Sequence, residues 1–188
     1  MAGVLGGWDS DDAIFRVKAV LTAVLAVLAA GLLVYAALHD LAVRTVPNWL
    51  PLLLALIGCS LRLASHSFFA GLAVAAVTFG VLFVLWLLGG MGGGDVKLWA
   101  AAALLIPPSL WPQLGFFSRV ILLGGVMALV YLALGLILPK PRASLSGSFV
   151  RRVLRVEAWR IGRRAPLPYA CAIAGGTLAT LLPLSFQR

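Results

Sequence analysis

Two aspartates at the edges of long apolar segments are the residues of this sequence best suited to acid–base chemistry. The other four acidic residues stand among polar or basic neighbours: Asp9, Asp11, Asp12 and Glu157. Asp40 closes one apolar segment and Asp95 opens another. A carboxylate inside a membrane-spanning segment costs about 3 kcal/mol and usually faces a wet cavity. Two such carboxylates together could share one proton and activate a water molecule.

Each aspartate also has a purely structural explanation. Asp95 follows three glycines and precedes an apolar run, so its side chain could simply cap a helix. Asp40 is a poorer cap because a negative charge at a helix C-terminus opposes the helix dipole. The same dipoles predict that Asp95 is the ionised base and Asp40 the protonated acid.

A glycine-rich break precedes Asp95. Glycines occupy 89, 90 and 92–94, where they permit unusual dihedral angles and close backbone approach, so that a substrate strand could lie against this segment. Lys97 follows two residues after Asp95. Its ammonium could orient a substrate or stabilise charge, or it could only extend to the membrane interface.

The elements that carry these residues are predicted to be membrane-spanning helices. The chain has 188 residues, of which 62% are hydrophobic and only 11% charged, and its mean hydropathy is +1.06. A span needs roughly 20 mostly apolar residues. Six segments meet or approach that length: 19–38, 45–61, 67–88, 98–118, 120–138 and 165–187. We therefore predict an all-α polytopic membrane protein with six transmembrane helices in a single domain, 1–188.

The fourth predicted span is interrupted. Pro107 and Pro108 follow only about ten residues after its start, which corresponds to about 15 Å of helix. Proline ends or kinks a helix, and the hydrocarbon core is about 30 Å thick. The fourth helix should therefore be short or kinked.

The basic residues predict the orientation. Of the 15 basic residues, eight lie at 139–165, which identifies this segment as a cytoplasmic loop. Alternation of spans then places the loops around Arg44 and Lys97 inside, with ten basic residues, and the termini and the loops near Arg62 and Arg119 outside, with five. Both aspartates fall at the cytoplasmic face. The net charge of +9 thus reflects topology rather than nucleic-acid binding.

Part of the basic loop has a helical pattern. Apolar residues recur at helical spacing through 149–164, with arginines from Arg151 to Arg164 on the opposite side. Such a helix could lie on an anionic lipid surface, or the loop could serve only to fix topology.

Three motifs together resemble a known family. The segment 40–48, DLAVRTVPN, resembles the first-aspartate motif of bacterial type IV prepilin leader peptidases, and 92–98, GGGDVKL, resembles their GxGD motif. The segment 168–175, PYACAIAG, is similar to their C-terminal P-Y-G-x-A-I segment, with Ala170 where glycine is usual, a change expected to touch packing rather than chemistry. The likeness runs from about 30 to 180.

The resemblance implies an aspartic endopeptidase of the bacterial cytoplasmic membrane. Its substrate would be a type IV or Flp-type prepilin, cut after a short basic leader at the cytoplasmic face. The implied site residues are Asp40 and Asp95 as catalytic groups, with Gly92, Gly94, Lys97, Pro47 and Asn48 shaping the site or binding substrate. No metal or cofactor is expected.

This chain looks like the minimal form of that family. Larger members carry a loop insert with paired C-x-x-C zinc ligands, associated with N-methylation of the pilin. Here only 41–46 separate Asp40 from Pro47, and the two cysteines stand singly in apolar segments, so methylation is not implied. The oligomeric state is not determined by the sequence.

Two other functions use the same features differently. A proton-coupled transporter could employ Asp40 and Asp95 as a proton relay, although it would tend to show repeated halves with matching broken spans. A non-catalytic scaffold for pilus assembly would not need both aspartates.

Overall fold

The computed structural model describes residues 10–137 and 167–186 as six helices. They are α1 (Ser10–Val43), α2 (Trp49–Ala64), α3 (Phe68–Leu87), α4 (Gly93–Leu105), α5 (Leu110–Ile137) and α7 (Tyr169–Phe186). The predicted basic loop 139–165, with its arginines from Arg151 to Arg164, lies outside the described residues. No strand occurs within the described ranges, and the predicted all-α class is confirmed.

The described helices have the lengths and apolarity of a membrane protein. Three of them are long and apolar enough to cross a membrane, over Ala13–Val43, Phe68–Leu87 and Leu110–Leu136. Two shorter helices are also apolar, at Trp49–Ala64 and Tyr169–Leu182. Large apolar side chains such as Phe69 and Leu136 are exposed on the outer surface, where lipid is the natural solvent.

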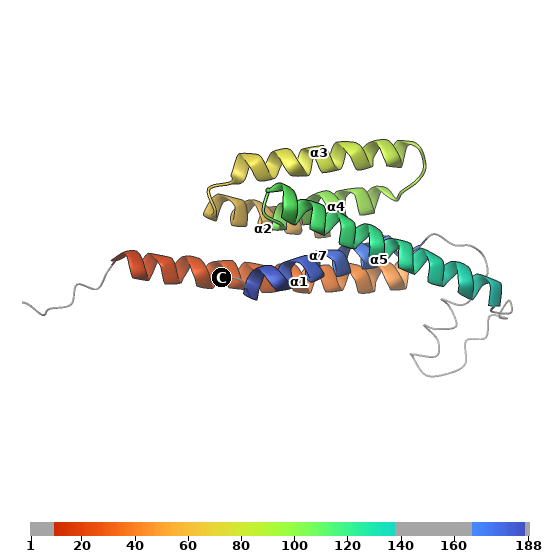
Figure 1. The fold of residues 1–188 in the computed structure, drawn as a ribbon, viewed down its shortest axis with the longest axis horizontal. Helices are drawn as coiled ribbons and strands as arrows, with labels where there is room; N and C mark the ends of the chain where they lie inside the picture. Colours follow the sequence, from red (N-terminus) through yellow and green to blue (C-terminus); the bar gives the residue numbers. More distant parts are fainter. Residues whose placement is uncertain (1–9, 138–166, 187–188) are drawn as a thin grey trace, which may run out of the picture.

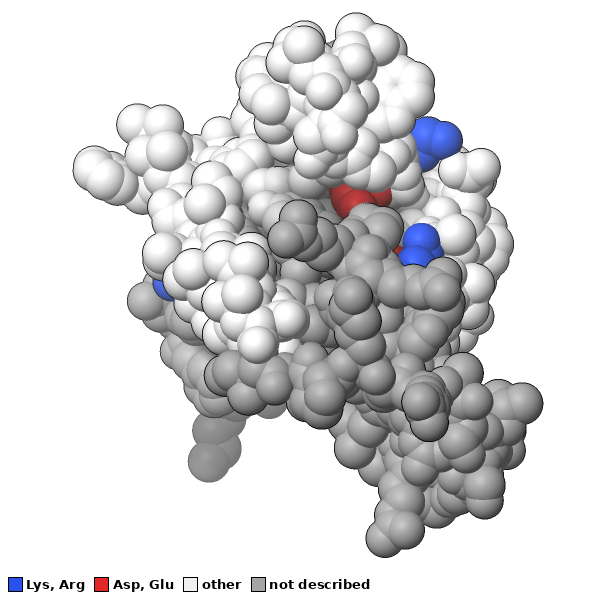
Figure 2. All heavy atoms as spheres, turned by 90° about the vertical axis from the view of Figure 1, so that its right-hand side faces the viewer, with Lys and Arg blue, Asp and Glu red and all other residues white. Residues whose placement is uncertain are grey.

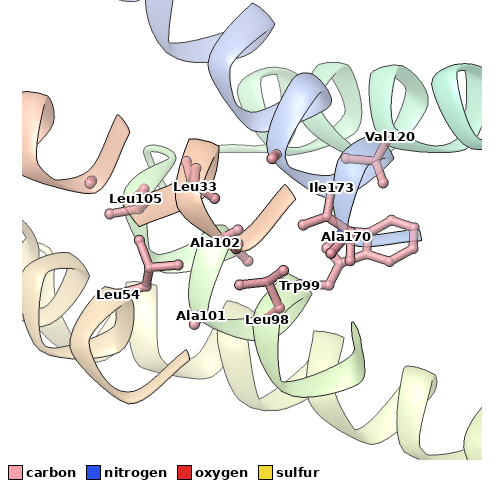
Figure 3. Close-up of a cluster of buried hydrophobic side chains, with 14 of the residues drawn as sticks. Leu33, Leu54, Leu98, Trp99, Ala101, Ala102, Leu105, Val120, Ala170 and Ile173 are labelled. Carbon is pink, nitrogen blue, oxygen red and sulfur yellow. The ribbon is translucent and has the colours of Figure 1, made fainter. Parts of the chain in front are cut away.

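The helices form layers around a central pair. Figure 1 shows α3 on one side of α2 and α4, and α1 with α7 on the other. α4 packs against α2, α3 and α7, while α7 packs against α1, α4 and α5. Three helices meet in the core shown in Figure 3, where Leu33 of α1, Ala102 of α4 and Ile173 of α7 are almost fully buried. Between them, α4 and α7 contact all the other described helices, so these two helices hold the bundle together.

The fourth helix is short, as predicted. α4 has 13 residues, and the residue after it, Ile106, is extended because it precedes Pro107. The side chain of Gln113, in the first turns of α5, donates from Nε2 to the carbonyls of Ala103, Ile106 and Pro107 at 3.1, 3.1 and 3.2 Å. These bonds satisfy carbonyl groups that the end of α4 would otherwise leave buried without partners.

The predicted boundary between the fourth and fifth spans is wrong. α5 runs without interruption from Leu110 to Ile137, so Arg119 lies inside a helix and not in an outer loop. One charged residue does not break a helix, whereas the two prolines do. Arg119 extends along its own helix past Gly115, and its Nη1 donates to Oγ1 of Thr180 on α7 at 3.4 Å. This long side chain can thereby remain charged within an apolar segment.

Candidate active site

The two aspartates lie at the same end of the bundle, on the right in Figure 1. Asp40 belongs to the last turn of α1, and Asp95 is the third residue of α4. The charge of Asp40 acts on Asp95, so the two carboxyls lie within electrostatic reach of each other. In Figure 2, acidic atoms occupy a hollow in this end face, with basic atoms beside them. The structure therefore brings together the two residues singled out from the sequence.

The environments of the two carboxyls differ. Asp40 is only 5% exposed, and its Oδ2 accepts a hydrogen bond from the backbone N–H of Ala170 at 3.2 Å. Asp95 is partly exposed. One carboxyl is thus held by the protein interior and the other faces the hollow.

Asp95 does not act as the N-cap of α4. That position is held by Gly92, in extended conformation and without a side-chain hydrogen bond, and the helix begins at Gly93, two residues before Asp95. A Cβ at Gly92 would lie 3.0 Å from Oδ2 of Asp95, so glycine leaves room for the carboxyl to turn back toward the start of the helix. The capping explanation for Asp95 is therefore not supported by the geometry.

The connection between α1 and α2 closes over the start of α4. A Cβ at Gly94 would lie 3.0 Å from Cβ of Val46 and 3.4 Å from its carbonyl oxygen, closer than an ordinary side-chain contact. Lys97 donates from Nζ to Oδ1 of Asn48 at 2.9 Å. Pro47 lies in the turn that starts α2, where its carbonyl accepts the N–H of Leu50 at 3.1 Å. The predicted site-shaping residues thus join the 44–48 connection to the first turn of α4.

A further hydrogen bond links the 44–48 connection to α1. Nδ1 of His39 lies 2.8 Å from the carbonyl oxygen of Thr45, which requires the tautomer with a proton on Nδ1. The ring of Tyr35 contacts both His39 and Trp49, with ring centroids 5.8 and 5.6 Å apart. These contacts connect the residue before Asp40 to the start of α2.

The start of α7 is the part of the site that the sequence did not reveal. Ala170 reaches Asp40 through its backbone N–H, a contact that alanine provides as well as glycine does. Tyr169 lies within electrostatic reach of Asp95, and its ring centroid is 5.8 Å from that of Trp99 on α4. Pro168 immediately before α7 is a typical signal for a helix N-terminus. The proline indicates that free backbone N–H groups follow it in the first turn of α7. It does not indicate that one of them bonds to Asp40.

The chain is similar in sequence to proteins of one known family. The model of the type IV leader peptidase family matches residues 26–133, more than half of the chain. The chain is 30% identical over 161 residues to the "Prepilin leader peptidase/N-methyltransferase" of Bacillus subtilis (strain 168). The match covers 84% of this chain but 54% of that protein, so the chain spans about half the length of its relative. No solved structure shows a significant match.

The matched region contains both aspartates, the glycine break and the connection that closes over it. This chain belongs to the type IV leader peptidase family.

Proposed function

We propose that this protein is a membrane aspartic endopeptidase that removes the short basic leader from a type IV or Flp-type prepilin. The observation that carries the proposal is that Asp40 and Asp95 lie within electrostatic reach of each other at the end of the bundle where α7 begins. Membership of the family and the name of the relative from Bacillus subtilis support a prepilin as substrate.

The pair would work through one water molecule. The ionised carboxylate takes a proton from the water as the water oxygen bonds to the scissile carbonyl carbon. The protonated carboxyl gives its proton to the carbonyl oxygen. When the tetrahedral intermediate collapses, the C–N bond breaks and the carboxyl that took the proton from water gives it to the departing amine. The other carboxyl regains its proton from a hydroxyl of the intermediate as the carbonyl re-forms, so the pair again holds a single proton. This cycle needs two carboxyls whose proton affinities differ, and the unlike surroundings of Asp40 and Asp95 supply that difference.

Lys97, Asn48, Gly92 and Gly94 shape the approach to the pair. The Lys97–Asn48 bond fixes the 44–48 connection beside the first turn of α4. The absence of side chains at Gly92 and Gly94 keeps the carboxyl of Asp95 and the backbone of Val46 close to this turn. An extended substrate segment would enter along this glycine break.

The active face is proposed to be cytoplasmic, with both chain termini outside the inner membrane. Arg44 and Lys97 lie at the site end, and the basic loop 139–165 follows α5, which ends on the same side. Arg119 lies within α5 and so no longer counts among the basic residues outside the membrane. The excess of basic residues on the cytoplasmic side is therefore larger than the sequence suggested. Thiol labelling of single cysteines introduced at Thr45 and His66, after replacing Cys59 and Cys171, would test this. Labelling of the Thr45 position from the periplasm would contradict the orientation.

A proton-coupled transporter could also use two neighbouring carboxyls, but family membership does not support that function. The two functions give different results for single substitutions. Asp40→Asn and Asp95→Asn should each abolish leader removal from a co-expressed prepilin, seen as a mobility shift on a blot. Asp12→Asn is the matched control, because residue 12 stands 28 positions before Asp40 on α1, about 40 Å along the helix. Normal cleavage by either active-site variant would refute the proposal.

A further inference from the structure

The carboxyl of Asp40 lies at the N-terminus of a helix that begins 129 residues later in the chain. The N–H of Ala170, the second residue of α7, donates to Oδ2 of Asp40 at 3.2 Å, and Ala170 is fully buried. The length is within the normal range for an N–H···O bond. The free N–H groups of a helix's first turn also carry partial positive charge. Asp40 therefore receives both a direct donor and a favourable dipole from α7.

This contact changes the electrostatic effect on Asp40 that α1 alone would have. Asp40 lies in the last turn of α1, whose dipole disfavours a negative charge there. The first turn of α7 exerts the opposite effect on the same carboxyl, so the two helix ends offset each other. The direct N–H bond remains, and such bonds are stronger to an ionised oxygen than to a neutral one. Since Asp40 is almost fully buried, that donor also replaces hydration that a charged carboxyl would lose.

Asp95 has no comparable donor. It lies in the first turn of α4, whose dipole favours its charge, but its carboxyl accepts no hydrogen bond within residues 10–137 and 167–186. Its carboxyl lies close enough to Asp40 for a charge on either residue to disfavour a charge on the other. Of the two, Asp95 is also the carboxyl nearer to solvent in the hollow, where a proton can be exchanged and donated to a substrate.

We infer that the backbone N–H of Ala170 is a positioning group that keeps Asp40 ionised, so that Asp40 is the general base and Asp95 carries the shared proton and acts as the acid. This assignment is the reverse of the one that the ends of α1 and α4 predict. It rests on the proposed function for its mechanistic meaning, but the protonation states themselves can be measured on the protein without substrate.

Other titratable or charged side chains lie at this end of the bundle: His39 near the end of α1, Arg44 just after it, Lys97 on α4, Tyr131 on α5, and Tyr169 and Cys171 on α7. All of them are unchanged in the test below. Their electrostatic effects on the two carboxyls are therefore the same in the parent protein and in the ester variants.

Removing a single donor distinguishes the two assignments. Two coupled carboxyls lose their protons in two macroscopic steps, which belong to the pair. If the first proton lost comes from Asp40, the Ala170 N–H stabilises both the singly and the doubly ionised pair, and it lowers only the first midpoint. If the first proton lost comes from Asp95, the N–H stabilises the doubly ionised pair, and it lowers only the second midpoint.

The experiment replaces the amide of Ala170 by an ester, through incorporation of the corresponding α-hydroxy acid into the full-length protein in detergent. The change deletes the N–H and retains the side chain. We expect the first midpoint to rise by about one pH unit, at the lower end of the range for a bond to a charged group, while the second stays constant. The matched control is the ester at Cys171, whose N–H bonds the carbonyl of Pro168 in the same turn. It should move neither midpoint.

The readout is NMR of ¹³C-labelled aspartate carboxyls, assigned with the Asp40→Asn and Asp95→Asn variants. Between the two midpoints the Asp40 signal should be that of a carboxylate and the Asp95 signal that of a carboxylic acid. A protonated Asp40 in that interval, or a shift of the second midpoint in the Ala170 ester, would overturn the assignment. Because the titration needs no substrate, these results are obtained whether or not the protein cleaves prepilins, and failure of the proposed function would be seen separately in the blot.

Discussion

Gly124 of α5 faces the ring of Tyr169, and this contact allows the geometry of the site to be perturbed from a distance. A Cβ at Gly124 would lie 2.8 Å from Cε2 of Tyr169 and 3.0 Å from both Cζ and the hydroxyl oxygen. These atoms belong to the rigid phenol group of Tyr169, whose ring also packs near Trp99, with centroids 5.8 Å apart. In Gly124→Ala the ring therefore has to move with the start of α7.

The size of this effect follows from the distances. Ordinary contact begins at 3.4 Å, so the ring must retreat by about 0.6 Å. Tyr169 is bonded to Ala170, whose N–H holds Asp40, and a misplacement near 1 Å at a reacting group costs on the order of 10²-fold in rate. We expect kcat/KM to fall by roughly 10- to 100-fold. The free energy of unfolding should fall by about 0 to 2 kcal/mol, because alanine gains about 1 kcal/mol in a helix and crowding costs about 1 to 3 kcal/mol.

Gly125→Ala provides the matched control. A Cβ at Gly125 meets nothing within 4 Å, so this variant should cleave normally and melt slightly higher than the parent protein. Cleavage of a purified prepilin in detergent measures the activity, and thermal unfolding measures the stability. In a Tyr169→Ala background, Gly124→Ala should have no further effect, because the clash is gone. Equal cleavage rates for Gly124→Ala and Gly125→Ala would refute the idea that Tyr169 links α5 to the site.

Four other substitutions test the contacts around the site and the break between α4 and α5. Lys97→Met and Asn48→Ala should each slow cleavage, and the double variant should be no slower than either one, because they share a single bond; kcat/KM values that multiply would argue for independent roles. Gly94→Ala should also slow cleavage, since its Cβ would press on the connection above it, with the rate compared at equal folded fraction. Gln113→Leu should lower stability by about 1 to 3 kcal/mol, as buried carbonyls at the end of α4 lose their donor, whereas exposed Ser118→Ala should not; equal melting temperatures would contradict the capping role.

Features that depend on local chemistry could be predicted from the sequence. Carboxylates are scarce in apolar segments, so Asp40 and Asp95 stand out from their neighbours by residue type alone. Asp95 after a glycine break indicated roughly where the fourth helix would begin, and α4 begins two residues before it, at Gly93; Pro107 with Pro108 predicted its early end. In each case the signal lies within a few residues of the element it determines, and the structure confirms that α4 is short.

Features that depend on packing between helices were not predictable. The bond from Ala170 to Asp40 joins residues 130 apart in the chain, and no residue type signals a backbone donor. Arg119 was assigned to a loop because charge was treated as a boundary, whereas its length lets it reach Thr180 while the helix continues. Likewise, Gln113 caps α4 across a turn. These three contacts depend on which faces of the helices pack against each other, and the hydropathy of the sequence does not determine which faces pack.

The shortness of α4 has a consequence for how the protein is made. A helix of 13 residues extends about 20 Å, well below the thickness of the hydrocarbon core, and its first turn carries Asp95 and Lys97. Such a segment has little tendency to enter a bilayer from the translocation channel by itself. Most of its surface is covered by α2 and α3, which are synthesised earlier, and by α7, which is synthesised last. Insertion of α4 therefore depends on helices already present in the membrane, and Asp40 receives its backbone donor from Ala170 only when α7 is in place.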